Sequence, residues 1–88
     1  MKQLELIQKV LKVKLKECQS SNILAYGWDA KKRSLIVVFK NYATYAYLHR
    51  SKEEFDELDQ AKSKGTWVNA NLVKPKAEFK RYVFSGIK

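Results

Sequence analysis

The apolar residues of the N-terminal segment fit two different periods. From Leu4 to Cys18 they recur at spacings of three and four, which is typical of an amphipathic helix. Around Val13, however, apolar residues alternate with lysines, which is typical of a strand. We therefore expect a short helix near residues 2–9 and an extended segment at 10–17.

Three further apolar segments predict strands. They lie at residues 23–28, 35–39 and 42–48 and are rich in β-branched and aromatic side chains. Lys40-Asn41 is the expected tight turn between the second and third, since asparagine tolerates left-handed backbone angles. Links as short as these favour an antiparallel meander.

An acidic helix is predicted to follow the strands. We expect Ser51 to begin it, with Glu54 as capping-box partner, and Gly65 to end it. Its narrow apolar stripe would lie on the sheet. One more helical turn is expected at residues 66–70, and an edge strand at 79–84.

These elements indicate an α+β fold. We expect a small antiparallel β-meander of three to four strands, one principal helix packed on one face, and an extra N-terminal helix or strand. A chain of 88 residues has room for one domain. It carries neither the apolar run needed to span a bilayer nor a secretory segment, and its lone Cys18 forms no internal disulfide. A cytoplasmic protein without membrane contact is expected.

The charge of the chain is large and uneven. The net charge is +9, although residues 51–60 hold five acidic residues against one lysine. The remaining surface is therefore strongly basic and would attract polyanions. The alternative is that these lysines simply solvate a small domain.

Catalytic and metal-binding chemistry has little support. His49 is the single histidine, and no recognised spacing joins it to Cys18 as a base and a nucleophile. One histidine and one cysteine do not make a zinc site, and no glycine-rich phosphate loop is present. We expect a non-enzymatic protein without cofactor or metal.

Tyr45 and Tyr47 are two residues apart, so both would leave the same face of a strand. They could stack on nucleotide bases, or they could form half of a hydrophobic core. Thr44 and Ala46 on the opposite face are small enough to lie under the helix, which would leave the tyrosines open. The candidate nucleic-acid-binding residues are three aromatic residues for bases and six cations for phosphates: Tyr45, Tyr47, Trp67, Lys40, Arg50, Lys74, Lys76, Lys80 and Arg81. Asn22 and Asn69 could bond to a base edge or a phosphate, or could satisfy backbone groups at turns.

Several motifs occur in a fixed order along the chain. They are Ser-Ser-Asn-Ile at 20–23, Tyr-Gly-Trp-Asp at 26–29, Phe-Lys-Asn at 39–41, Tyr-Ala-Tyr at 45–47 and Ser-Lys-Gly-Thr-Trp-Val-Asn at 63–69. In these motifs the chain resembles the KTSC domain, a family named after the C-terminus of lysyl-tRNA synthetase. The resemblance places the domain at 20–84, an N-terminal extension at 1–19 and a tail at 85–88.

RNA binding has been suggested for that family, and stand-alone copies occur in bacteria and their phages. The resemblance and the basic charge together predict a nucleic-acid-binding domain, with RNA favoured as partner. The alternative is a small phage or bacterial protein that binds an acidic host protein and inhibits or adapts it. An open sheet edge would support a homodimer.

Overall fold

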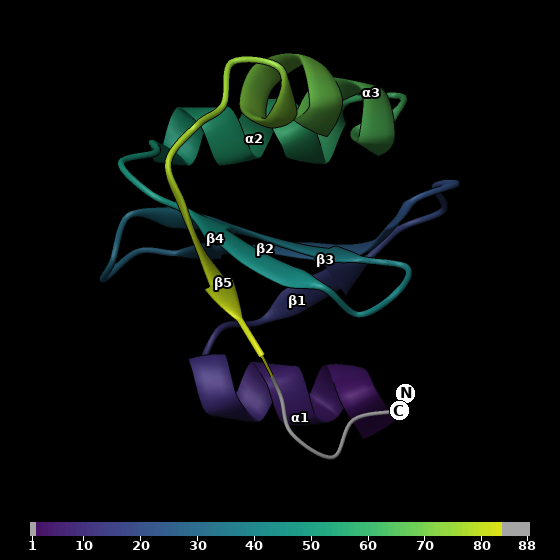
Figure 1. Cartoon of the computed structure of the whole chain (residues 1–88), viewed down its shortest axis with the longest axis vertical. Coiled ribbons are helices and arrows are strands. Elements are labelled where there is room, and N and C mark those ends of the chain that lie inside the picture. Colours follow the sequence, from purple (N-terminus) through teal and green to yellow (C-terminus); the bar gives the residue numbers. More distant parts are fainter. Residues whose placement is uncertain (1, 84–88) are drawn as a thin grey trace.

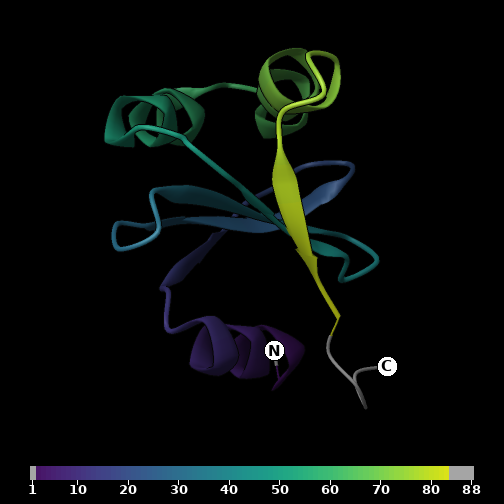
Figure 2. The same cartoon turned by 60° about the vertical axis from the view of Figure 1, so that its left-hand side comes forward.

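The computed structural model describes residues 2–83, which form three layers (Figure 1). A five-stranded sheet lies between α1 on one face and the remaining helices on the other. Figure 2 shows β5 running from the α3 side of the sheet toward the α1 side. In chain order the elements are α1 (Lys2–Leu11), β1 (Leu15–Glu17), β2 (Ile23–Asp29), β3 (Ser34–Phe39), β4 (Thr44–Tyr47), α2 (Lys52–Gln60), α3 (Lys64–Val68), the π-helix η1 (Asn69–Val73) and β5 (Phe79–Tyr82).

The sheet is a meander. Its strands follow the order β1-β2-β3-β4-β5, and every neighbouring pair is antiparallel. The predicted α+β fold and the meander are confirmed. There are five strands rather than three to four, because the N-terminal extended segment and the segment after η1 both join the sheet.

Both periods of the N-terminal segment are correct, but for different residues. The helix is longer than expected and continues to Leu11, and the strand begins only at Leu15. Lys12 ends the helix: it takes a left-handed backbone angle, with φ of 57°, and its amide donates to the Gln8 carbonyl. The Gln8 side chain then accepts a hydrogen bond from the Leu15 amide at 2.8 Å. This second bond ties the end of α1 to the start of β1.

The central strand β3 is buried on both faces, and the sheet therefore needs helices on both sides. Leu35 and Val37 are buried on the α2–α3 side, while Ile36 and Val38 are buried on the α1 side. An uninterrupted apolar strand of this kind requires cover on both faces. One principal helix is therefore not enough. On the α1 side the buried residues are Leu4, Ile7, Val13, Ala25, Ile36, Val38 and Ala46.

The faces of β4 are the reverse of what we expected. Ala46 packs on the α1 side, whereas Tyr47 packs on the α2–α3 side beside Leu58 of α2 and Val68 of α3. The expectation that the acidic helix covers the small residues was wrong. The N-terminal helix α1 covers that face, and this leaves the tyrosine face to the later helices.

Ser51 and Glu54 form the predicted capping box at the start of α2. The Ser51 hydroxyl accepts from the Glu54 amide at 3.2 Å, and the Glu54 carboxylate accepts from the Ser51 amide at 3.1 Å. The predicted end was wrong, because α2 stops at Gln60 and Gly65 lies inside α3. The Lys64 ammonium group caps the C-terminal end of α2 by donating hydrogen bonds to the carbonyls of Asp59 and Ala61.

The turn between β3 and β4 also differs from its prediction. Tyr42, not Asn41, takes the left-handed angle, with φ of 66°. The Asn41 side chain instead accepts a hydrogen bond from the Ala43 amide at 3.0 Å. Asparagine thus stabilises this turn through its side chain rather than through its backbone.

Candidate functional site

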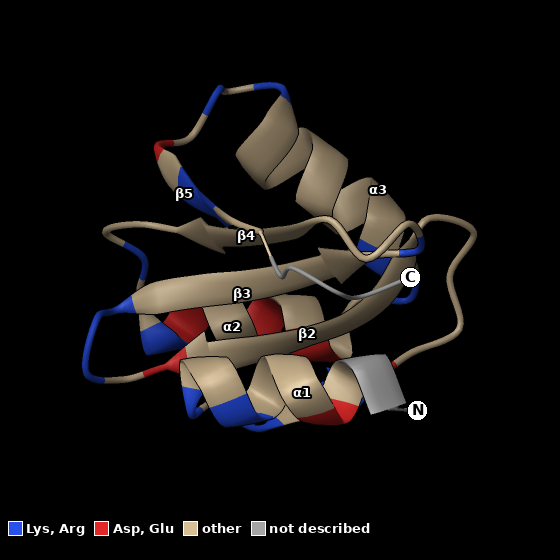
Figure 3. Ribbon diagram, turned by 60° about the horizontal axis from the view of Figure 1, so that its bottom comes forward, with Lys and Arg blue, Asp and Glu red and all other residues tan. Residues whose placement is uncertain are grey.

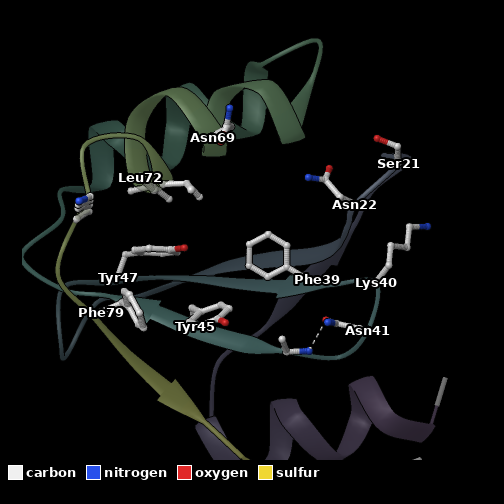
Figure 4. Close-up of a pocket in the computed structure, with 14 residues that line it drawn as sticks. Ser21, Asn22, Phe39, Lys40, Asn41, Tyr45, Tyr47, Asn69, Leu72 and Phe79 are labelled. Atoms are coloured by element: carbon white, nitrogen blue, oxygen red, sulfur yellow. Dashed lines mark hydrogen bonds between the residues drawn. The ribbon is translucent and has the colours of Figure 1, made fainter.

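Four aromatic rings from three strands meet on the α2–α3 side of the sheet (Figure 4). The ring of Tyr45 lies between two others, with centroid distances of 5.5 Å to Phe39 and 5.0 Å to Phe79, both edge-on. Tyr47 completes the group, 6.2 Å from Tyr45 and 5.8 Å from Phe79. The strand register explains the last contact, because Tyr47 is directly opposite Phe79 on β5. We call these four residues the aromatic cluster.

The aromatic cluster lines a cavity of about 860 Å³, which we call the η1 pocket. Asn69 and Leu72 of η1 line it from the side opposite the sheet (Figure 4). Its volume is in the range of about 300–1,000 Å³ that is usual for ligand sites. The other lining residues are Ser21, Asn22, Lys40, Asn41, Ala43, Val73, Lys76 and Ala77.

The structure confirms one of the two sequence-based interpretations, the hydrophobic core, for Tyr47, whereas base stacking by Tyr45 stays a prediction. Tyr47 is only 4% exposed and belongs to the hydrophobic core. Burial, with a smaller effect of nearby Tyr45, raises the pKa of the Tyr47 phenol above its usual value. Tyr45 is half-buried and lines the pocket. An open platform of two tyrosines is therefore absent, because the later helices cover this face of the sheet.

Three of the predicted cations lie at or beside the η1 pocket. Lys40 and Lys76 line it, and the Arg81 guanidinium lies 5.8 Å from the centre of the Tyr45 ring. Lys74 is exposed in the segment between η1 and β5, two residues before Lys76. Within residues 2–83, none of these four side chains has a carboxylate partner. Their charge is therefore open to an anionic ligand.

The remaining three predicted residues are not part of this site. Trp67 packs against the core from α3 and does not line the pocket. Arg50 is engaged by Glu54 at 3.1 Å, and its amide bonds to the Arg33 carbonyl beside the β2–β3 turn. Lys80 lies over the Tyr82 ring, whose contacts are on the α1 side of the sheet. Because side chains alternate between the two faces along β5, Lys80 lies on the α1 side and its neighbour Arg81 on the α2–α3 side.

The candidate set also missed residues that line the pocket. Phe39 was predictable, because it shares the parity of Leu35 and Val37 along β3. Phe79 was not predictable, because the face on which it lies depends on the register of β5 against β4. Leu72 was not predictable either, because its position depends on the path of η1 across the sheet.

Gly65 lets α3 approach the Ser20–Asn22 turn closely. A Cβ at this position would collide with the Asn22 side-chain oxygen and would lie 3.3 Å from the Ser20 hydroxyl oxygen. The Ser20 hydroxyl in turn donates to the Asn22 side chain and accepts from the Ile23 amide. The Asn22 side chain thus bonds to the Ser20 hydroxyl and not, as one of its two interpretations had predicted, to a backbone group, and it also lines the η1 pocket.

A second basic region lies at the other end of the β2–β3 hairpin. Lys31 and Lys32 of the turn and Lys12 after α1 line a hollow of about 500 Å³ beside Trp28. Figure 3 shows the basic turn next to the C-terminal part of α1, with acidic segments concentrated on α2. The Asp29 carboxylate holds the turn by accepting from the Lys31 and Lys32 amides. The positive charge is thus divided between two ends of the sheet.

One acid of α2 is tied to the sheet. The Tyr26 hydroxyl donates to the Asp59 carboxylate at 2.6 Å, and the Lys16 ammonium group lies 3.0 Å from the same carboxylate. The hydrogen bonds from Tyr26 and Lys16 hold the pKa of Asp59 below its usual value. Burial, followed by the bond to Asp59, raises the pKa of the Tyr26 phenol. This cluster joins α2 to β1 and β2.

The single thiol and the single histidine have separate partners. The Cys18 thiol donates to the Ile23 carbonyl at 3.6 Å, and burial raises its pKa. The His49 ring lies 3.1 Å from the Glu78 carboxylate. Among the described residues there is no group of three or more side chains suited to hold a metal ion. No helix within 2–83 has the length and apolar character needed to cross a membrane.

The fold and the site define a small α+β domain with a ligand-sized pocket between a meander sheet and a π-helix. The family model of the KTSC domain matches residues 19–75. A protein from Tsukamurella paurometabola is 41% identical over 58 residues, which cover 66% of this chain and 85% of that protein. The crystal structure of a KTSC domain protein from Yersinia pestis superposes with a TM-score of 0.72 and 27% identity, covering 81% of this chain and 99% of the other. The chain belongs to the KTSC domain family, as its ordered motifs predicted.

Proposed function

We propose that this domain is a non-enzymatic nucleic-acid-binding module with RNA as its preferred ligand. The observation that carries the proposal is the η1 pocket, where an aromatic cluster lies beside lysines that have no acidic partner within residues 2–83. Nucleic-acid binding needs both parts, because cations neutralise phosphates and flat rings hold bases. RNA is favoured because proteins mostly read it at unpaired bases stacked on aromatic side chains.

The net charge supports the same proposal at longer range. A net charge of +9 on 88 residues attracts a polyanion before contact and raises the rate of encounter. The basic region around Lys31 and Lys32 would add further phosphate contacts at the other end of the β2–β3 hairpin.

The test is the salt dependence of binding to a labelled single-stranded RNA and to a DNA of the same sequence. The logarithm of the association constant should fall linearly with the logarithm of the salt concentration, by about 0.7 per phosphate contact. Lys40→Gln should reduce that slope by about one contact. Lys62→Gln is the control, since Lys62 is exposed and does not line the pocket.

Absence of binding by both nucleic acids at low salt would contradict the proposal. The alternative of an acidic protein partner would then gain support. Leu6 and Val10 of α1 favour that alternative, since they are 41% and 55% exposed on a helix that also carries Lys9.

A further inference from the structure

The η1 pocket has the form of a slot and not of an open sheet surface. Leu72 of η1 lies over Tyr47, and Asn69 lies over Phe39 (Figure 4). Successive bases laid flat across the strands, as on an uncovered sheet, would collide with η1. A single planar ring has room to enter the cavity of about 860 Å³.

The lining suits a planar heterocycle. Phe39 and Phe79 meet the Tyr45 ring edge-on, at interplanar angles of 80° and 89°, so the cluster presents both ring faces and ring edges to the cavity. Such a ring would gain stacking and edge contacts together with the burial of its apolar surface. Leu72 supplies an aliphatic contact from the opposite side.

Two asparagines line the same cavity, and one of them can read the edge of such a ring. The side-chain amide nitrogen of Asn22 forms no hydrogen bond with any described residue and points toward the cavity, whereas the Asn69 side chain points away from the aromatic cluster (Figure 4). The Asn22 amide is therefore available to a base edge, which carries donors and acceptors that amides match well. The sequence alone left this role of the asparagines open.

The lysines indicate that the ring belongs to a chain. Lys40 directly follows Phe39, and Lys76 lies three residues before Phe79, so the two cations come from segments at either end of the aromatic cluster. A free nucleotide carries phosphate on one side of its sugar, whereas an internal nucleotide is flanked by phosphates on both sides. Two separated cations match the second arrangement.

We propose that the η1 pocket takes up one unpaired nucleotide of a nucleic-acid strand, with its base against Tyr45, its edge at Asn22, and its flanking phosphates at Lys40 and Lys76. This inference rests on the proposed function and adds to it a specific ligand form. A paired base cannot enter, because it would first have to leave its stack. The domain should therefore select bulges, loops and single strands over uninterrupted duplex.

Three matched ligands test the proposal: an RNA duplex with one bulged nucleotide, the same duplex with an abasic bulge, and the fully paired duplex. Their phosphate charge is nearly equal, so differences in affinity report the base. The bulged duplex should bind roughly 5- to 100-fold more tightly than the other two, which is the usual range for one stacked base. Adenosine monophosphate should compete only weakly.

Two variants connect that preference to the pocket. Ala43→Leu extends a lining side chain into the cavity, and Asn69→Asp places a negative charge at an exposed lining position. Each should abolish the preference for the bulge, so that the bulged and the paired duplex bind with affinities within about twofold of each other. Ala70→Leu and Gln60→Glu are the matched controls, because both residues are exposed and neither lines the pocket. Melting temperatures of all variants show which remain folded, and Asn69→Asp serves if Ala43→Leu unfolds.

The outcomes separate this inference from the proposed function. If neither the single strands nor any of the three duplexes binds at low salt, the proposed function fails, and this inference fails with it; if only the single strands bind, nucleic-acid binding stands and the inference is overturned. If all three bind with equal affinity, nucleic-acid binding stands and the inference is overturned. Competition by adenosine monophosphate at the affinity of the bulged duplex would also overturn it, since the ligand would then be a free nucleotide.

Discussion

Tyr45 and Tyr47 lie on the same face of β4 but differ in burial. Both leave β4 on the α2–α3 side, yet Tyr47 is buried in the core and Tyr45 lines the η1 pocket. The difference comes from what lies above each ring, because Leu72 covers Tyr47. The sequence correctly predicted that both tyrosines leave the same face of β4. It did not predict which of them is buried, because that depends on η1, more than twenty positions later in the sequence.

The Tyr26–Asp59–Lys16 cluster leads to a prediction about pH. Asp59 has a lowered pKa in the folded state, so its contribution to stability is complete above the unfolded pKa of about 3.9 and is lost as pH falls through the lower folded value. Asp59→Asn should lower the free energy of unfolding by about 1 kcal/mol at pH 7. Denaturant unfolding should show this difference shrinking below pH 4. Glu57→Gln, an exposed acid of the same helix, should show no comparable change.

Gly27 and Gly65 differ in how much space each leaves for a side chain, which leads to a second prediction for single residues. A Cβ on Gly27 would lie 2.7 Å from the Lys14 carbonyl oxygen, which is backbone, and 2.9 Å from a Leu15 methyl group. Gly27→Ala should therefore cost about 1–3 kcal/mol of stability, as overpacking usually does. Gly65→Ala meets no backbone atom: its nearest neighbours are the exposed Asn22 side chain and the Ser20 hydroxyl, and both side chains can rotate away. Thermal unfolding should show a clear loss for Gly27→Ala and little change for Gly65→Ala, and the opposite order would contradict this account.

At the scale of the element, the start of α2 was predicted and its end was not. The Ser51–Glu54 capping box is a local motif within one turn, so its residues identify it. The end of α2 at Gln60 depends on Lys64, which reaches back to the last carbonyls from the next helix. Gly65 was interpreted as a stop signal, but it serves the contact between α3 and Asn22.

The capping box can be tested directly. Ser51→Ala removes the acceptor of the Glu54 amide and should lower the free energy of unfolding by about 0.5–2 kcal/mol. Glu54→Ala alone and the double variant complete a cycle, and the two losses should not add, because the residues bond to each other. Additive losses would mean that the two hydrogen bonds act independently.

At the scale of the whole molecule, the domain consists of a sheet covered on both faces. The family match at residues 19–75 includes neither α1 nor β5, although α1 buries Leu4 and Ile7 against the sheet and β5 contributes Phe79 to the aromatic cluster. The central strand needs α1, because Ile36 and Val38 would otherwise face water. The pocket likewise depends on β5 and η1 together.

The cover by α1 predicts a contrast between two neighbouring residues. Ile7→Ala should cost about 2–5 kcal/mol, because Ile7 is 0% exposed and its removal leaves a cavity. Leu6→Ala, at a residue 41% exposed, should change stability by less than about 1 kcal/mol. Chemical denaturation of both variants gives the comparison. Equal effects would show that α1 is not packed on the sheet in solution.

The local pattern of the sequence by itself determined the central strands β2, β3 and β4, their antiparallel order and the capped start of α2, because each of these depends on residues close together in the chain. The ordered motifs between residues 20 and 69 indicated the family. Only the tertiary structure decided which face each helix covers. α1 and the later helices compete for the two faces of β3. The spacing of apolar residues within one segment does not indicate which helix covers which face. The η1 pocket follows from the same choice, since its rings, amides and lysines come from five separate segments brought together by the register of β5 and the path of η1.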